Sequence, residues 1–130
     1  MNKHLNNTLS KALGLALIAL AAVFCAREQR VSFARDVKPV LDQYCVECHQ
    51  PGGAGYAASG LDVTSYAGVM QGTRNGPMVI PGDSMGSNLV VLMEGRADPS
   101  IKMPHGSSTK VRVAEIDTIS AWIDQGAKNN

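Results

Sequence analysis

The sequence predicts a small all-α domain that follows an N-terminal targeting segment. Two amphipathic helical patterns frame the domain, one near residues 33–44 and one near residues 113–123. The chain has 130 residues, of which 45% are hydrophobic and 18% charged, as is ordinary for one globular domain. The segments between the two patterns are rich in glycine and proline and contain few strand-forming runs.

Residues 1–26 have the pattern of a Sec-type signal peptide. Lys3 and Lys11 precede an uncharged apolar run of 15 residues, residues 12–26. This run is shorter than the roughly 20 residues that cross a bilayer comfortably, so an uncleaved membrane anchor is the second choice. In both cases the domain is expected outside the cytoplasm, in the periplasm or an equivalent compartment.

The domain itself is expected to occupy residues 27–130. Cys25 is a candidate lipid attachment site, although bulky Phe24 stands where lipoprotein signals carry a small residue. Removal of residues 1–26 leaves ten basic and eleven acidic residues, interspersed along the chain without a basic stripe. This charge pattern argues against nucleic acid as a partner and says nothing of the oligomeric state.

The first helical pattern follows Ser32, a candidate N-cap. Its buried face is formed by apolar and aromatic residues at helical spacing, namely Phe33, Val37, Val40, Leu41 and Tyr44. Because Pro39 has no backbone N–H, the sequence allows two positions for the start of the helix. The helix begins at Phe33, or it begins near Lys38 and the preceding residues form a separate turn.

The middle of the chain combines loops with short helices. Residues 50–60 contain four glycines, so a loop is expected there. Short helices are expected around residues 65–70 and 87–94. The last helix follows a stripe that ends near Gly126 and comprises Val113, Ile116, Ile119, Trp122 and Ile123.

The stretch CVECH, residues 45–49, carries the strongest chemical signal. A C-x-x-C-H run is the attachment signature of c-type haem. On a helical turn, Cys45 and Cys48 face the same way, so both can form thioethers to one edge of a porphyrin. His49 then lies under the ring, where its imidazole can bind the iron. The motif therefore favours a covalently bound haem c, with one such site in the chain.

Two other chemistries fit the same cysteines less well. A zinc site needs four ligands, and beyond this motif the domain offers only His105. A thioredoxin-like dithiol is expected at a strand-to-helix junction of a βαβ unit, and the flanking sequence shows no such alternation.

The sixth position of the iron has several candidate ligands. The methionines of the domain are Met70, Met78, Met85, Met93 and Met103. Most methionines in small domains fill the core. Met103 lies in the run IKMPHG, which has no helical periodicity, and it is the predicted ligand. His105 is the alternative and would give a lower reduction potential, whereas a vacant position would admit gases or peroxide.

Taken together, these motifs resemble class I cytochromes c, and more narrowly the planctomycete-type cytochrome c domain. The resemblance covers most of residues 32–127 and includes FARDVKPVLDQYCVECH, SGLDVTSYAGVMQG, NGPMVIPGDSMGSNLV, KMPHG and EIDTISAWIDQGA. It implies a fold whose first and last helices pack beside the haem, with His49 and Met103 as axial ligands. It also implies that the backbone carbonyl near Pro77 accepts a hydrogen bond from the free ring nitrogen of His49. Arg112 departs from the pattern, because related sequences carry Thr or Ser before the last helix.

The resemblance implies a one-electron carrier between protein redox partners, one of which could be a membrane-bound oxidoreductase. No nucleophile with a neighbouring base accompanies the haem motif, so no catalytic role is expected. Two alternatives are a haem enzyme or sensor of gas or peroxide with an open or labile sixth position, and a haem subunit of a larger oxidoreductase.

Overall fold

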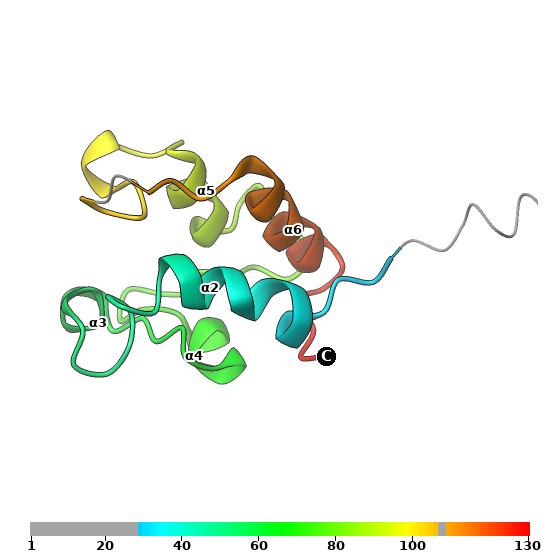
Figure 1. Ribbon diagram of the computed structural model, residues 1–130, viewed down its shortest axis with the longest axis horizontal. Helices are drawn as coiled ribbons and strands as arrows, with labels where there is room; N and C mark the ends of the chain where they lie inside the picture. Colours follow the sequence, from blue (N-terminus) through cyan, green and yellow to red (C-terminus); the bar gives the residue numbers. More distant parts are fainter. Residues whose placement is uncertain (1–28, 107–108) are drawn as a thin grey trace, which may run out of the picture.

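The computed structural model describes residues 29–106 and 109–130, and this part of the chain is all-α (Figure 1). The elements in order are η1 (Phe33–Val37), α2 (Lys38–Tyr44), α3 (Ala54–Ser59), α4 (Tyr66–Gln71), α5 (Asn88–Glu94), η2 (Pro99–Ile101) and α6 (Val113–Asp124). No strand forms within the described ranges, where one isolated bridge pairs Thr73 with Gly76. The predicted fold class is therefore confirmed. The predicted signal peptide and Cys25 lie outside the described residues.

None of the described helices has both the length and the apolar composition needed to cross a membrane. In the view of Figure 1, α2 lies between α3 and α4 on one side and α5 and α6 on the other.

The first helix begins with a wide turn. The Ser32 hydroxyl accepts a hydrogen bond from the Arg35 N–H at 3.2 Å, as expected of an N-cap. In the π-helical turn η1, each of the N–H groups of Val37 and Lys38 donates to the carbonyl five residues earlier. This turn precedes Pro39, whose ring would clash with the carbonyl four residues earlier in a regular α-helix. Helical backbone thus starts at Phe33, and the regular helix starts at Lys38.

The core lies where η1 and α2 pack against α6. Leu41, Ile119 and Trp122 are almost completely buried. The Phe33 ring lies 5.3 Å from the Tyr66 ring and 5.4 Å from the Trp122 ring, measured between centroids. The indole N–H of Trp122 donates to the Lys128 carbonyl at 2.9 Å, so the buried polar atom of this residue is satisfied. This aromatic cluster joins the first helix to the last one.

The last helix starts at the predicted place although its cap is unusual. Arg112 is the N-cap residue, and its backbone N–H donates to the Glu115 carboxylate at 3.0 Å. The Arg112 guanidinium forms an ion pair with the same carboxylate. In a capping box, the Glu side chain accepts a hydrogen bond from the N-cap backbone N–H, and Glu115 does so here. The second contact of the box, in which a Thr or Ser side chain accepts from the helix, is replaced by the ion pair between Arg112 and Glu115.

One member of the predicted stripe is not buried. Val113 is 74% exposed, whereas the other four members are buried. Val113 is the first residue of α6 and borders a cavity rather than the core. At the other end, Gly126 has φ +96° and its N–H donates to Ile123, while the Ala127 N–H donates to Trp122. This is a Schellman ending, as the glycine indicated.

The prediction that residues 50–60 form a loop is wrong, because α3 occupies the second half of this stretch. The helix receives support from distant residues. The Arg74 guanidinium donates to the carbonyls of Ala57 and Ala58 at 2.7 and 2.9 Å, which satisfies orphan acceptors at the helix end. Glycine content alone does not reveal such a contact.

The two short helices in the middle are confirmed as α4 and α5. Ser65 caps α4 by accepting a hydrogen bond from the Gly68 N–H at 3.1 Å. Ser87 precedes α5, but its buried hydroxyl donates to the Asp83 carbonyl at 2.7 Å and accepts from the Ile80 N–H at 2.8 Å. Ser87 therefore organises the loop before α5 rather than capping the helix.

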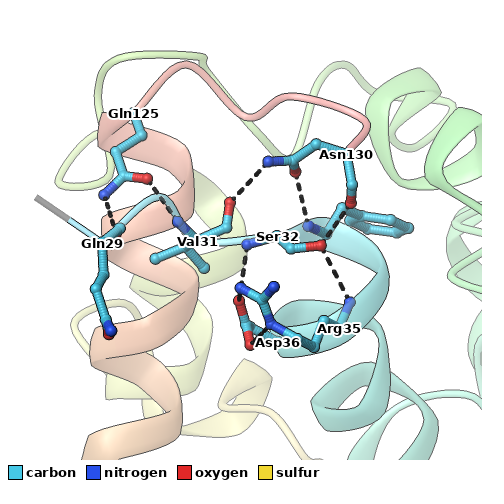
Figure 2. Close-up of polar contacts among 8 residues, drawn as sticks. Gln29, Val31, Ser32, Arg35, Asp36, Gln125 and Asn130 are labelled. Carbon is cyan, nitrogen blue, oxygen red and sulfur yellow. Dashed lines mark hydrogen bonds and ion pairs between the residues drawn. The ribbon is translucent and has the colours of Figure 1, made fainter. Parts of the chain in front are cut away.

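Hydrogen bonds join the start of η1 to the end of the chain (Figure 2). We call the residues Val31, Ser32, Gln125 and Asn130 the terminal clasp. The Val31 N–H donates to the Gln125 side chain at 2.8 Å, and the Ser32 hydroxyl donates to the Asn130 carbonyl at 2.6 Å. The Asn130 side chain accepts from the Phe33 N–H at 3.0 Å and donates to the Val31 carbonyl at 3.2 Å. The clasp holds the first helix against the segment that follows α6.

Candidate functional site

The CVECH stretch forms a helical turn that continues α2. The Cys45 N–H donates to Leu41 at 2.9 Å, and the His49 N–H donates to Cys45 at 2.9 Å. Both cysteines are free thiols, with Cys45 partly buried and Cys48 exposed. The turn therefore presents two unpaired sulfur atoms three residues apart, as attachment of a haem requires.

The Cys45 thiol has little thiolate character. Burial, followed by the neighbouring Cys48, raises the pKa of Cys45 to about 11. Redox-active Cys-x-x-Cys motifs instead carry a cysteine of lowered pKa. In the described part of the chain, no group of three His, Cys, Asp or Glu side chains is placed to bind a metal ion. Neither finding supports the dithiol or the zinc interpretation.

His49 is partly buried and packs over α3. A Cβ atom at Gly55 would lie only 2.7 Å from Cε1 and 2.9 Å from Nδ1 of the His49 ring. Within the described residues, Nδ1 is buried and has no hydrogen-bond partner. Burial is the largest cause that lowers the pKa of His49, and a hydrogen bond with the backbone of Leu61 acts in the opposite direction. An uncharged imidazole is the form that can ligate a metal ion through one of its ring nitrogens.

The backbone around His49 is held from two sides. The Tyr56 N–H, in α3, donates to the Cys48 carbonyl at 2.9 Å, and the Val63 N–H donates to the His49 carbonyl at 2.9 Å. Pro77 is exposed, and Nδ1 makes no hydrogen bond to its carbonyl. The contact between Pro77 and His49 therefore stays a prediction.

A cavity of about 780 Å³ lies between α5, η2 and the start of α6. Its lining includes four of the predicted sixth-ligand candidates, Met85, Met93, Met103 and His105. Met103 is partly buried, and its N–H donates to the Leu92 carbonyl at 3.1 Å, which anchors the loop to α5. Met78 belongs to the core and Met70 packs against it, so neither borders this cavity.

The structure places the two halves of the predicted site at one end of the molecule. In Figure 1, the segment between α2 and α3 and the yellow-to-orange loop between α5 and α6 both lie away from the C-terminus. Cys45, Cys48 and His49 are not among the residues that line the cavity. The sulfur of Met103 and the ring of His49 are therefore not brought into one enclosed space.

Gly55 is a site residue that the sequence analysis missed. The sequence contains one indication of its role. Gly55 is followed by Tyr, Ala and Ala, which are compatible with a helix, so the glycine stands inside a possible helix. Glycine in a helix is unfavourable relative to alanine, so its presence can mark a close approach of another group. Here that group is the imidazole of His49.

These residues fit a haem c. The chain offers two free thiols on one helical turn, a buried ring nitrogen without a protein partner, and a methionine at the edge of a cavity. Thioether, imidazole and thiol are all established haem-binding groups.

Comparison with known proteins supports the same conclusion. Residues 45–106, just under half of the chain, match the family model described as planctomycete cytochrome C. The matched segment begins at Cys45 and includes His49, Pro77 and Met103. No curated protein and no solved structure gives a significant match. Cytochrome c domains of this kind imply a covalently bound haem c and generally transfer electrons. The match over residues 45–106 therefore supports a planctomycete-type cytochrome c domain, a haem-binding domain of the electron-carrier type.

Proposed function

We propose that this protein is an extracytoplasmic monohaem electron carrier in which His49 and Met103 are the axial ligands of the iron. The observation that carries the proposal is the pair of free thiols on one helical turn, directly before a histidine with a buried and unpartnered ring nitrogen. The Met103 side chain, at the edge of the cavity, supplies the second ligand.

Each residue has a separate task in this proposal. A bound haem supplies a couple that accepts and releases one electron. Cys45 and Cys48 are the residues that would hold the haem, through thioether bonds that would prevent its dissociation. Burial lowers the pKa of His49 and so favours the uncharged imidazole, which is the form that binds a metal ion. The hydrogen bond from the Met103 N–H to Leu92 fixes the base of the second ligand on α5.

The signal-peptide pattern of residues 1–26 supports a location in the periplasm or an equivalent compartment. The partners in this proposal are protein donors and acceptors of single electrons, including a membrane-bound oxidoreductase. The protein catalyses no reaction of its own. A haem enzyme, a gas sensor and a subunit of a larger oxidoreductase are the rival functions that experiments must separate.

The first experiment is the visible spectrum of the dithionite-reduced full-length protein, expressed with haem-maturation machinery, before and after addition of carbon monoxide. A six-coordinate spectrum that carbon monoxide does not change is expected, because two protein ligands close the iron. A clear spectral shift would establish an accessible iron and would favour the enzyme or sensor function. Copurification with a partner enzyme would favour the subunit function.

Covalent attachment can be tested by substitution of the cysteines. The intact mass of the wild-type chain is expected to exceed that of the processed polypeptide by one haem. Cys45→Ser with Cys48→Ser is expected to abolish the covalent haem, since no other cysteine lies in the predicted domain. Cys25→Ser is the matched control and should retain it. Haem that stays covalently bound in the double variant would overturn the assignment.

A further inference from the structure

We propose that His105 is a second ligand for the sixth position, which binds the iron whenever the Met103 thioether is lost. This inference rests on the proposed function. It concerns the loop between η2 and α6, and it does not alter the roles of Cys45, Cys48 and His49.

His105 has the position and the freedom that a second ligand needs. It lines the same cavity as Met103, two residues further along the chain. Its side chain is exposed, and it makes no hydrogen bond with any other described residue. Both ring nitrogens are therefore unengaged by the described part of the protein.

The loop allows the two residues to exchange. The Met103 N–H is anchored to Leu92, but residues 104–106 donate no backbone hydrogen bond within the described ranges. Gly106 has φ +65°, and apart from its chain neighbours no atom of the described residues lies within 4 Å of the position of a Cβ there. Two residues span at most about 7 Å of extended chain. A shift confined to this short loop can thus replace one side chain by the other.

The other side chains at the cavity are weaker candidates. Lys102 and Lys110 line it, but an ammonium group has no lone pair until it loses a proton. The Lys102 side chain also packs closely against Gly95, where a Cβ would lie 2.8 Å from its Cδ. Met93 is buried in α5, and Met85 is 67% exposed and lies before that helix. Imidazole is in addition one of the commonest protein ligands of haem iron.

The exchange breaks one iron–sulfur coordination bond and forms one iron–nitrogen bond. No electron is transferred in it, and no covalent bond of the chain changes. The product has two histidine ligands and is expected to have a lower reduction potential than the His49–Met103 form.

The test compares four haem-loaded full-length proteins, namely the wild type, Met103→Leu, His105→Ala and the double variant. Leucine keeps the volume of methionine but has no sulfur, and His105 is exposed, so both substitutions should preserve the fold. Wild type and His105→Ala are expected to show the sulfur-to-iron charge-transfer band of a methionine ligand. Met103→Leu is expected to lose this band and yet to stay low-spin with the electron paramagnetic resonance signal of two histidines. The double variant is expected to become high-spin.

Carbon monoxide and imidazole provide a second readout. Carbon monoxide should bind the reduced double variant at least about tenfold more tightly than Met103→Leu, which corresponds to His105 occupying the iron about 90% of the time. Added imidazole should return the double variant to the low-spin spectrum. Met103→Leu with Lys110→Ala is the matched control and should behave like Met103→Leu alone.

The outcomes separate the inference from the proposed function. If Met103→Leu is high-spin and equal to the double variant, His105 is not a ligand, while the wild-type band still supports Met103. If the band survives in Met103→Leu, another methionine is the ligand and both assignments fail. If Met103→Leu does not retain haem, Met103→Ala is the second variant, to which the same expectations apply.

Discussion

The contact between Gly55 and His49 shows how one absent side chain can set the position of a candidate ligand. The His49 ring occupies the space that a Cβ of residue 55 would need, with three ring atoms within 2.9 Å of that position. Such distances are not compatible with any real side chain, so the ring or helix α3 must move if the residue is enlarged. Gly55 is therefore a positioning residue for His49.

We predict that Gly55→Ala destabilises the protein and alters its haem spectrum. Helix propensity alone predicts the opposite, a gain of up to about 1 kcal/mol in α3. The steric clash should outweigh that gain, because the nearest atoms belong to a ring held by its backbone on both sides. Urea denaturation gives the stability, and the fraction of low-spin iron reports the ligation of His49.

The matched control is Ala58→Gly, which changes the same helix at an exposed position. It should lower stability by up to about 1 kcal/mol through propensity and leave the haem spectrum unchanged. A stabilised Gly55→Ala protein with a normal spectrum would show that the contact has no role in positioning His49.

At the scale of the elements, the start of α6 is connected to α2 by charge. Glu115 is buried and accepts the Arg112 N–H, while the Tyr44 hydroxyl of α2 lies beside the same carboxylate. Hydrogen bonding from the Arg112 guanidinium is the largest cause that lowers the pKa of Glu115 from 4.5 to about 2. Glu115 in turn raises the pKa of Tyr44. One carboxylate thus supports both the cap of α6 and the residue that precedes Cys45.

The stability contributed by Glu115 should depend on pH. Because its pKa is lower in the folded protein than in the unfolded chain, the contribution is complete above pH 4.5 and is lost as the pH falls toward 2. Glu115→Gln is therefore expected to cost up to about 1 kcal/mol at pH 7, a small value because the Arg112 partner is largely exposed. The difference in stability between Glu115→Gln and the wild type should become smaller as the pH falls from 4.5 toward 2. Thermal unfolding at pH 7, 4 and 3 measures it.

Asp117→Asn is the control, since it removes a charge from the same helix at an exposed position. Its effect should be smaller than that of Glu115→Gln at pH 7. A difference that persists unchanged at pH 3 would mean that Glu115 acts through packing and not through its charge.

At the scale of the whole molecule, the terminal clasp joins segments nearly one hundred residues apart (Figure 2). The Asn130 side chain both accepts from the Phe33 N–H and donates to the Val31 carbonyl. One of its hydrogen bonds is made by the N–H of Phe33, whose ring contacts Trp122. The clasp therefore lies directly beside the aromatic cluster of the core.

Asn130→Ala is expected to lower the free energy of unfolding by about 1–2 kcal/mol, because it leaves the partly buried Phe33 N–H without its acceptor. The same substitution should speed hydrogen exchange at the Phe33 amide. Asn129→Ala, at an exposed neighbouring residue, is the control and should change neither quantity. Equal effects of the two substitutions would show that the clasp does not contribute to stability.

Local signals in the sequence were sufficient for most of the helices. Ser32, Ser65 and Gly126 each mark a helix end through contacts within a few residues, and the stripe of α6 repeats every three or four residues. The backbone of the CVECH turn is likewise set largely by local contacts, since the N–H groups of residues 45, 46, 48 and 49 donate to carbonyls no more than five residues earlier. For this reason the fold class, the family resemblance and the two cysteines could be predicted without a structure.

Contacts between distant residues account for what the sequence did not reveal. α3 depends on Arg74, the close packing of His49 depends on Gly55, and Val113 continues a stripe beyond the point where the core ends. Composition and periodicity report only the backbone's local preferences, and they cannot say which surfaces meet in the folded chain. The shared cavity of Met103 and His105 belongs to this second class, because its walls come from α5, η2 and α6 together.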